Sequence, residues 1–302
     1  MRGNLQRSTG PDRRTDGDGA PRCQIWGVLN VTPDSFSDGG LFLDRAAALT
    51  QAEHLVRSGA DVVDVGGEST RPAGREYGSG ATAVGLSEEL RRIMPVVEHL
   101  VSVLGARVSV DTTKPGVARR ALAEGAAIVN DVSCGTIAEL LDVTAEAGAE
   151  LVLMHNRGRG EVSPDNVRYA DVVAEVIEEL LGAVQRAVAA GVREELIWID
   201  PGVGFAKTAA QSVELVARTA ELVATGQPVL VGTSRKSFIA ELAPAPDGAR
   251  PPPMERDGGT AATVVAAVLA GARGVRVHDV AAMRQAVRVA EALRACSSGR
   301  AA

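Results

Sequence analysis

The sequence predicts an α/β protein made of a single (β/α)8 TIM barrel. Eight short runs rich in Val, Ile and Leu alternate with eight Ala-rich stretches whose apolar residues recur at helical spacing. The length of 302 residues suits one such barrel. The alternative is an open, doubly wound sheet. No GxGxxG motif follows the first run, however, and eight repeats favour closure.

The predicted strands are short, and several are apolar throughout, as expected of parallel strands that are buried on both faces. They span residues 24–29, 62–65, 108–110, 127–129, 151–154, 196–199, 229–231 and 274–277. A helical stretch follows each of them. This alternation is typical of a parallel sheet, because parallel neighbours are joined by crossover connections.

The predicted helices fill the intervals between these strands. They span residues 45–58, 88–104, 117–123, 138–147, 172–190, 212–222, 260–270 and 280–293. Ser87 is the expected N-cap of the second helix, and Pro115 fits a first helical turn before the third. Glycines such as Gly125 and Gly148 are expected to end helices in the left-handed conformation. Five prolines within residues 243–259 exclude regular structure there and predict a long loop after the seventh strand.

Composition narrows the classes of function. The formal net charge of −6 disfavours general binding to nucleic-acid phosphates, although basic side chains that converge locally can still bind a small anion. Cys23, Cys134 and Cys296 lie far apart in the sequence and are predicted to be reduced thiols rather than a disulfide framework. No apolar run reaches the length of a membrane span.

The ends of the chain differ from its centre. Residues 1–22 are polar and lack the apolar core of a secretory signal, so we expect a disordered leader and a cytoplasmic protein. The barrel should occupy residues 23–296, and residues 297–302 should form a disordered tail.

Unusual residues follow the first two predicted strands, at the end of the barrel where active sites form. Asn30 can ligate a hard cation through its amide oxygen, and Phe36 lies on a Gly-flanked loop where it can cover a ligand. Arg71 follows several small residues and can offer its fork of donors to an anion. Taken singly, these segments are also compatible with a plain polar turn and a solvated arginine.

Polar residues end three further strands. Asp111 ends the third, Asn130 and Asp131 the fourth, and Asp200 the sixth. A carboxylate accepts from neighbouring N–H groups, and an amide both donates and accepts, so together they can bind a flat heterocycle. One such residue is usually a helix N-cap, but four at three strand ends indicate a site.

The last two predicted strands carry basic residues. Lys236 and Ser237 lie in the segment GTSRKS after the seventh strand, and Arg276 and His278 occupy alternate positions at the end of the eighth. Phosphate sites recur at this place in such barrels. His278 considered alone is more often structural.

Eight blocks in order resemble the signature motifs of the dihydropteroate synthase family, from about residue 24 to residue 293. They are NVTPDSFSDGG (30–40), GGESTRP (66–72), SVDTTKP (109–115), NDVS (130–133), MH (154–155), DPGVGFAK (200–207), SRKS (234–237) and RVHDV (276–280). The resemblance implies a folate-pathway transferase that joins a pterin pyrophosphate to p-aminobenzoate. It also implies a homodimer and a Mg2+-assisted reaction.

The resemblance assigns roles to matching positions. The pterin residues would be Asp111, Asn130, Asp200 and Lys236, with Met154 and Phe205 lining the slot. Asn30 would lie near the Mg2+ ion and the pyrophosphate, which Arg71, Arg276 and His278 would hold. The p-aminobenzoate site would contain Phe36, Thr70, Pro72, Lys236 and Ser237, and Asp38 would organise the first loop and the developing cation. Catalytic roles would fall to Asp38, Arg71, Lys236, Arg276 and His278.

Small departures from the family pattern leave these groups in place. Val203 and Ala206 differ from the residues usual in the DPGxGFGK-like block, and Ala73 replaces an expected glycine. Two other functions fit parts of the pattern: a pterin-dependent methyltransferase domain and a non-catalytic pterin-binding paralogue. Neither needs Lys236 together with Arg276. We expect Arg276 to act on the pyrophosphate and barely on the pterin.

Overall fold

The computed structural model describes residues 22–32, 41–68, 84–157 and 166–297, without the side chains of residues 41–44. The predicted leader and tail lie almost entirely outside these residues. Eight parallel strands form one sheet in the order β6-β5-β4-β3-β2-β1-β8-β7. They are β1 (Gln24–Asn30), β2 (Val62–Gly66), β3 (Val108–Asp111), β4 (Ile128–Asp131), β5 (Glu150–Met154), β6 (Ile197–Asp200), β7 (Leu230–Val231) and β8 (Gly274–Val277).

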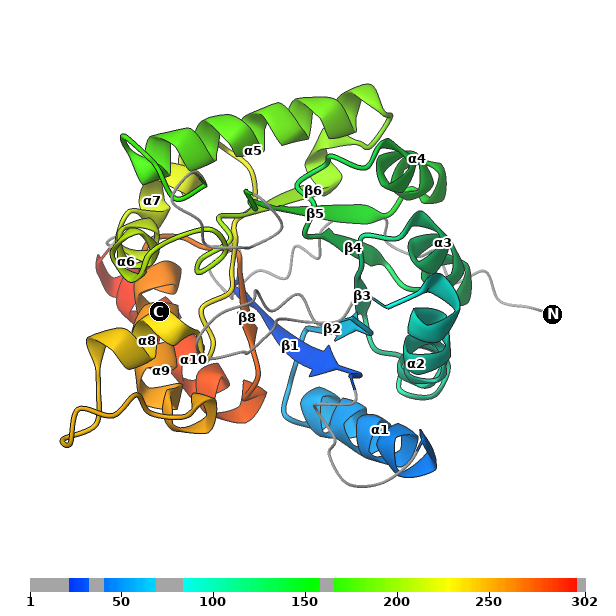
Figure 1. The fold of residues 1–302 in the computed structure, drawn as a ribbon, viewed down its shortest axis with the longest axis horizontal. Coiled ribbons are helices and arrows are strands. Elements are labelled where there is room, and N and C mark those ends of the chain that lie inside the picture. The colour runs from blue at the N-terminus through cyan, green and yellow to red at the C-terminus, as the bar shows by residue number, and fades with distance from the viewer. Residues whose placement is uncertain (1–21, 33–40, 69–83, 158–165, 298–302) are drawn as a thin grey trace.

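The sheet closes into the predicted barrel between β6 and β7. Ile199 and Val229 form a single parallel bridge there, and the Ile199 N–H donates to the Pro228 carbonyl at 3.0 Å. Figure 1 shows the strands at the centre of a ring of helices. The fold class expected from the sequence is therefore confirmed.

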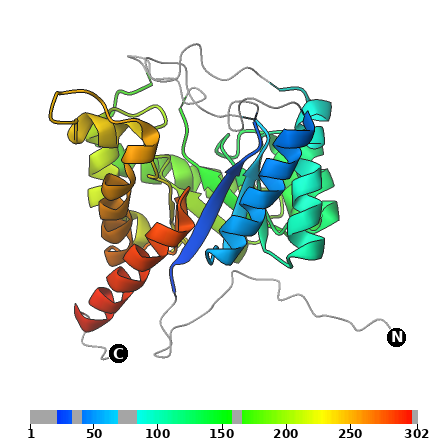
Figure 2. The same ribbon diagram turned by 90° about the horizontal axis from the view of Figure 1, so that it is seen from below.

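The helices surround this barrel. They are α1 (Leu41–Arg57), α2 (Leu86–Glu98) with the π-helix His99–Val103, α3 (Pro115–Glu124), α4 (Ala138–Ala147), α5 (Val172–Ala189), α6 (Ala209–Ala217), α7 (Thr219–Val223), α8 (Ser237–Leu242), α9 (Asp257–Leu269) and α10 (Val280–Ser297). Short 3-10 helices span Glu194–Leu196 and Pro253–Glu255. Figure 2 shows β1 between the flanking helices α1 and α10. None of the helices in the described part of the chain is both long and apolar enough to span a membrane.

Three predictions of local structure, two for helices and one for a loop, were wrong in detail. Gly85, not Ser87, is the N-cap of α2, because the helix begins at Leu86 and the Gly85 carbonyl accepts its first backbone bonds. The predicted helix 212–222 is two helices that meet at Arg218. The predicted loop 243–259 contains a 3-10 turn and the start of α9, whose first residue is Asp257.

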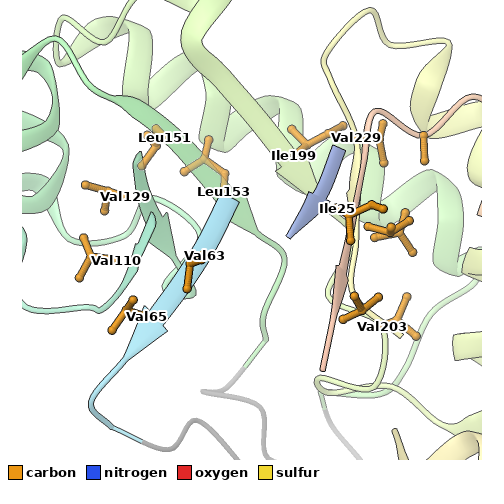
Figure 3. Packing of buried hydrophobic residues seen from close by; sticks show 14 of the residues in the cluster. Ile25, Val63, Val65, Val110, Val129, Leu151, Leu153, Ile199, Val203 and Val229 are labelled. Atoms are coloured by element: carbon orange, nitrogen blue, oxygen red, sulfur yellow. The ribbon is translucent and has the colours of Figure 1, made fainter. Parts of the chain in front are cut away.

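The hydrophobic core lies mainly between the outer face of the barrel and the helices. Figure 3 shows strand residues of this layer, among them Val63, Val110 and Ile199. Their neighbours along each strand point into the barrel because side chains alternate. Cys23 and Cys134 are buried, Cys296 is exposed, and all three are free thiols, as predicted.

Two tryptophans fill the barrel interior near the beginnings of the strands. The rings of Trp26 and Trp198 meet edge to face with centroids 5.5 Å apart. The Trp198 indole N–H donates to Glu150 Oε2 at 2.9 Å, and Arg107 pairs with the same carboxylate. A Cβ on Gly274 would lie 2.8 Å from Leu230 and 3.3 Å from the Trp26 ring, so the glycine gives the indoles their space. This packing closes one end of the barrel and leaves the other for a site.

Candidate active site

The strand ends bring the predicted pterin residues together. In the sheet register Asp111 of β3 lies beside Asn130 of β4, and Met154 of β5 lies beside Asp200 of β6. All four side chains are buried. The predicted grouping of these residues at one end of the barrel therefore agrees with the geometry.

A network of four side chains from four strands occupies this end. Arg276 Nε donates to Asp64 Oδ2 at 2.5 Å, and Arg276 Nη2 donates to Asp111 Oδ2 at 2.9 Å. Asn130 Nδ2 donates to Asp64 Oδ2 at 3.1 Å. Asp64 was not among the predicted site residues. Its only signal in the sequence is an acidic residue inside an otherwise apolar strand.

Burial dominates the electrostatics of Asp111. Loss of solvent raises the pKa of its carboxyl group well above the usual range, and the Arg276 guanidinium opposes this shift. The Asp64 carboxylate, which shares that guanidinium, raises the pKa further. Asp111 Oδ1 is buried without a hydrogen-bond partner among the residues that the structure describes, so it is available to accept from a ligand.

A tight turn holds Asp200. Its Oδ1 accepts from the Gly202 N–H at 2.7 Å, and its backbone carbonyl accepts from the His155 N–H at 2.8 Å. Gly202 has a φ of +62°, and a Cβ there would lie 1.9 Å from the His155 carbonyl oxygen, so this position requires glycine. Burial raises the pKa of Asp200, and the nearby ammonium of Lys236 counteracts the shift.

Lys236 joins the same turn from the segment after β7. Its Nζ donates to the Val203 carbonyl and lies 4.6 Å from the centroid of the Phe205 ring. Burial lowers the pKa of Lys236 to about 8, and Asp200 opposes that shift. The predicted residues Asp200, Phe205 and Lys236 therefore form one unit.

A buried pair without an assigned role lies beneath this unit. Lys207 Nζ is 2.9 Å from His155 Nδ1 and donates to the Phe205 carbonyl at 2.9 Å. His155 Nε2 is 2.9 Å from Glu179 Oε2. Burial lowers the pKa of Lys207 to about 7, with repulsion from Lys236 as the next cause. Lys207 belongs to the DPGVGFAK block, but no function was predicted for it.

Of the remaining predicted residues, some lie near these clusters, one faces away from them, and five lie outside the described part of the chain. The His278 ring lies 3.0 Å from the Ser234 hydroxyl through Nδ1, and Ser237 is the first residue of α8 after Lys236. Asp131 turns away to accept from the backbone N–H groups of Ser133 and Gly135. Five predicted residues lie outside the residues that the structure describes: Phe36, Asp38, Thr70, Arg71 and Pro72.

Asn30 is the predicted metal residue and the last residue of β1. Its Oδ1 lies 3.7 Å from the place that a Cβ on Gly66 would occupy, near the Asp111 side chain. The described residues contain no group of three His, Cys, Asp or Glu that could hold a metal ion. An amide oxygen at the mouth suits a Mg2+ ion whose other ligands come from phosphate oxygens and water.

Comparisons with known proteins agree with this geometry. A family model described as pterin binding enzyme matches residues 26–278. A dihydropteroate synthase of Mycobacterium leprae is 49% identical over 88% of this chain and 92% of its own length. The crystal structure of Xanthomonas albilineans dihydropteroate synthase with 4-aminobenzoic acid is 44% identical, covers 91% of this chain and 94% of its own, and superposes with a TM-score of 0.81. The same protein in complex with 7,8-dihydropteroate gives 40% identity over 91% and 94% of the two chains and a TM-score of 0.79.

Proposed function

Because this chain belongs to the dihydropteroate synthase family of pterin-binding enzymes, we propose that it condenses 6-hydroxymethyl-7,8-dihydropterin pyrophosphate with p-aminobenzoate. The products would be 7,8-dihydropteroate and pyrophosphate. The observation that carries the proposal is the convergence of Asp111, Asn130, Asp200 and Lys236 at one end of the barrel. These groups offer buried donors and acceptors of the kind that a flat, polar heterocycle requires.

The pterin ring would lie between the two clusters of the site. Asp111 and Asn130 on one side and Asp200 on the other can accept from ring N–H and amino groups. Met154 and Phe205 supply apolar surface beside them. Lys236 has a pKa of about 8 and is mostly protonated at neutral pH, so it can donate to a ring oxygen or nitrogen.

The reaction needs charge stabilisation rather than a covalent nucleophile. The bond between the pterin CH2 group and the diphosphate oxygen breaks, the amine of p-aminobenzoate forms the new C–N bond, and the amine releases a proton. Arg276, with Arg71 and His278 in the roles that the family resemblance gives them, would stabilise the departing anion. The ring can delocalise positive charge left on the CH2 group, and the carboxylates of Asp200 and Asp111 would favour that state.

We extend the proposal to a bound Mg2+ ion near Asn30. The ion would supply positive charge that favours departure of the diphosphate, whose oxygens would complete its coordination. Asn30 and the diphosphate form a suitable set of hard oxygen ligands.

We also propose a cytoplasmic homodimer. Three large apolar side chains, Leu269 of α9 and Val289 and Leu293 of α10, are exposed on adjacent helices and support an association face there. Sedimentation of the purified chain tests the dimer.

One assay tests the function. Pyrophosphate release should require both the pterin pyrophosphate and p-aminobenzoate, and should stop when either is omitted. Pterin binding without pyrophosphate release would instead indicate a non-catalytic paralogue. Transfer of a methyl group from a pterin donor would indicate the methyltransferase alternative.

A further inference from the structure

Asp64 is a fully buried carboxylate in the middle of β2. Among the described residues, its two polar contacts reach other strands: Asn130 of β4 and Arg276 of β8. The two contacts use the same oxygen, Oδ2. Oδ1 is buried with no hydrogen-bond partner in the described part of the chain. Burial of a carboxylate is unfavourable unless donors compensate for it. An apolar side chain such as Val at position 64 would avoid this desolvation penalty, so the carboxylate calls for an explanation.

The contact with Asp64 determines which way the Asn130 amide faces. The two ends of an Asn side chain have nearly the same shape, and their hydrogen-bond partners decide which end is the amino group. Asp64 Oδ2 accepts from the Arg276 guanidinium, and at 3.1 Å it also requires a donor from Asn130. The amino group of Asn130 therefore faces Asp64. Its carbonyl oxygen is left to act as an acceptor elsewhere.

The same carboxylate restricts Arg276. Nε is engaged by Asp64 and Nη2 by Asp111, so two carboxylates from neighbouring strands fix the plane of the guanidinium. Nη1 is the nitrogen that neither carboxylate engages. Asp64 thus orients one acceptor, on Asn130, and one donor, on Arg276, at the same end of the barrel.

We propose that Asp64 is a positioning residue that sets the hydrogen-bonding polarity of the pterin pocket. It need not touch the pterin. It holds Asn130 so that an acceptor faces the ring, and it holds Arg276 in plane with Asp111. This inference rests on the proposed function, because it assumes that the ligand that Asn130 meets is a pterin with N–H groups.

The decisive test removes the acceptor that Asn130 and Arg276 share. Asp64→Leu keeps a similar volume but offers neither group an acceptor, so the Asn130 amide is no longer held with its amino group away from the ring. We expect the Kd for 6-hydroxymethyl-7,8-dihydropterin, measured by calorimetry, to rise about ten-fold or more, as for one mismatched hydrogen bond. Asp64→Asn can still present its carbonyl oxygen to both groups, because both contacts use one oxygen, and it should retain more of the affinity than Asp64→Leu.

A double-mutant cycle with Asn130→Ala tests whether Asp64 acts through Asn130. Once the Asn130 amide is absent, Asp64→Leu should cost less pterin affinity than it does in the wild type, which is non-additivity in the cycle. A purely structural role for Asp64 predicts instead that the two losses add.

Glu150→Gln is the matched control. Glu150 is also buried and also accepts from an arginine and a side-chain N–H, but it lies at the opposite end of the barrel. This variant should lose thermal stability while its Kd for the pterin stays within about two-fold of wild type. Unchanged pterin affinity in Asp64→Leu, or additive losses in the double variant, would overturn the proposal. If Asp64→Leu does not fold, Asp64→Asn decides: a neutral amide oxygen is a weaker acceptor than a carboxylate, so its Kd should still rise, and an unchanged Kd would overturn the proposal. A wild-type chain that binds no pterin would overturn the proposed function instead.

Discussion

The side-chain nitrogen of Lys207 lies 2.9 Å from Nδ1 of His155, beneath the turn that carries Asp200 and Phe205. His155 contacts Glu179 through its other nitrogen, so a ring with its proton on Nε2 can donate to Glu179 and accept from Lys207. Burial lowers the pKa of His155, which favours this neutral form. Within the described part of the chain, Lys207 thus has two acceptors, a ring nitrogen and a carbonyl, and no carboxylate in hydrogen-bond contact.

Lys207→Met should change the pH dependence of stability. Burial lowers the folded-state pKa of Lys207 to about 7 from the ordinary lysine value of 10.5. Repulsion from Lys236 and Arg157 lowers the pKa further, and Asp200 and Cys134 oppose the shift. The folded wild type therefore binds a proton more weakly than the unfolded chain, and its stability rises with pH between these two values. The variant lacks this rise. Its melting temperature relative to wild type should be highest near pH 6 and fall steadily toward pH 10. A difference that is constant across this range would contradict the assignment.

Arg276→Lys should weaken binding of the bare pterin as well as of pyrophosphate. The sequence alone suggested an effect mainly on pyrophosphate. In the structure, however, the guanidinium bridges Asp64 and Asp111 through two different nitrogens. A lysine has a single ammonium group and cannot reproduce this planar, two-sided contact. We expect turnover to fall and both ligands to lose affinity. Separate titrations with pyrophosphate and with a pterin lacking phosphate measure the two losses. A loss of affinity for pyrophosphate alone would instead support the expectation from the sequence, that Arg276 acts on the pyrophosphate and barely on the pterin.

Asp200→Ala should weaken pterin binding strongly and leave the barrel folded. The substitution removes the acceptor of the Gly202 N–H and the carboxylate whose charge favours protonated Lys236. A ligand donor left unpaired in a buried site costs about 1–3 kcal/mol. Calorimetry with the pterin measures the loss, and circular dichroism checks the fold. Wild-type affinity in a folded variant would exclude Asp200 from the pocket.

Gly274→Ala should destabilise the barrel without changing ligand affinity. Its Cβ would approach Leu230 Cδ1 to 2.8 Å inside the packed cluster around Trp26 and Trp198. Overpacking of this kind costs about 1–3 kcal/mol. Gly258→Ala in the first turn of α9 is the control, because a Cβ there meets nothing within 4 Å. The control should gain about 0.5–1 kcal/mol. Urea unfolding midpoints distinguish Gly274→Ala from Gly258→Ala. Equal midpoints would show that the tryptophan cluster can rearrange to accommodate the added methyl group.

The alternation of strands and helices was predictable because each strand lies in a run of apolar residues. Predicted strand ends differ from the observed ones by no more than two residues. The differences have a pattern: β1, β3 and β6 extend by one residue to include Asn30, Asp111 and Asp200. Backbone pairing does not depend on the polarity of the side chain, so the ladder continues into the site. The six-residue helix α8 was missed because so short a segment has little periodicity.

The site was only partly predictable because some of its contacts are purely tertiary. Asp111, Asn130 and Asp200 stand at strand ends, where a polar residue after an apolar run is visible. Asp64 lies inside such a run, and its partner Arg276 is 212 positions away in the sequence. Ser87 illustrates the opposite error: its type suits an N-cap, yet α2 begins before it. Local preference cannot reveal contacts that depend on how the barrel closes.

The pairing of β1 with β8 means that the last strand to be synthesised completes the sheet beside the first. Asp64 emerges from the ribosome long before Arg276. A nascent chain therefore contains the carboxylate that is buried in the native fold before it contains the guanidinium that pairs with it. Until β8 arrives, β1 also keeps an unpaired edge that can associate with other chains. A chain truncated before residue 274 should therefore aggregate rather than retain a weakened site. In the native fold, β8 both pairs with β1 and supplies Arg276 to the pocket, so one strand serves the sheet and the site.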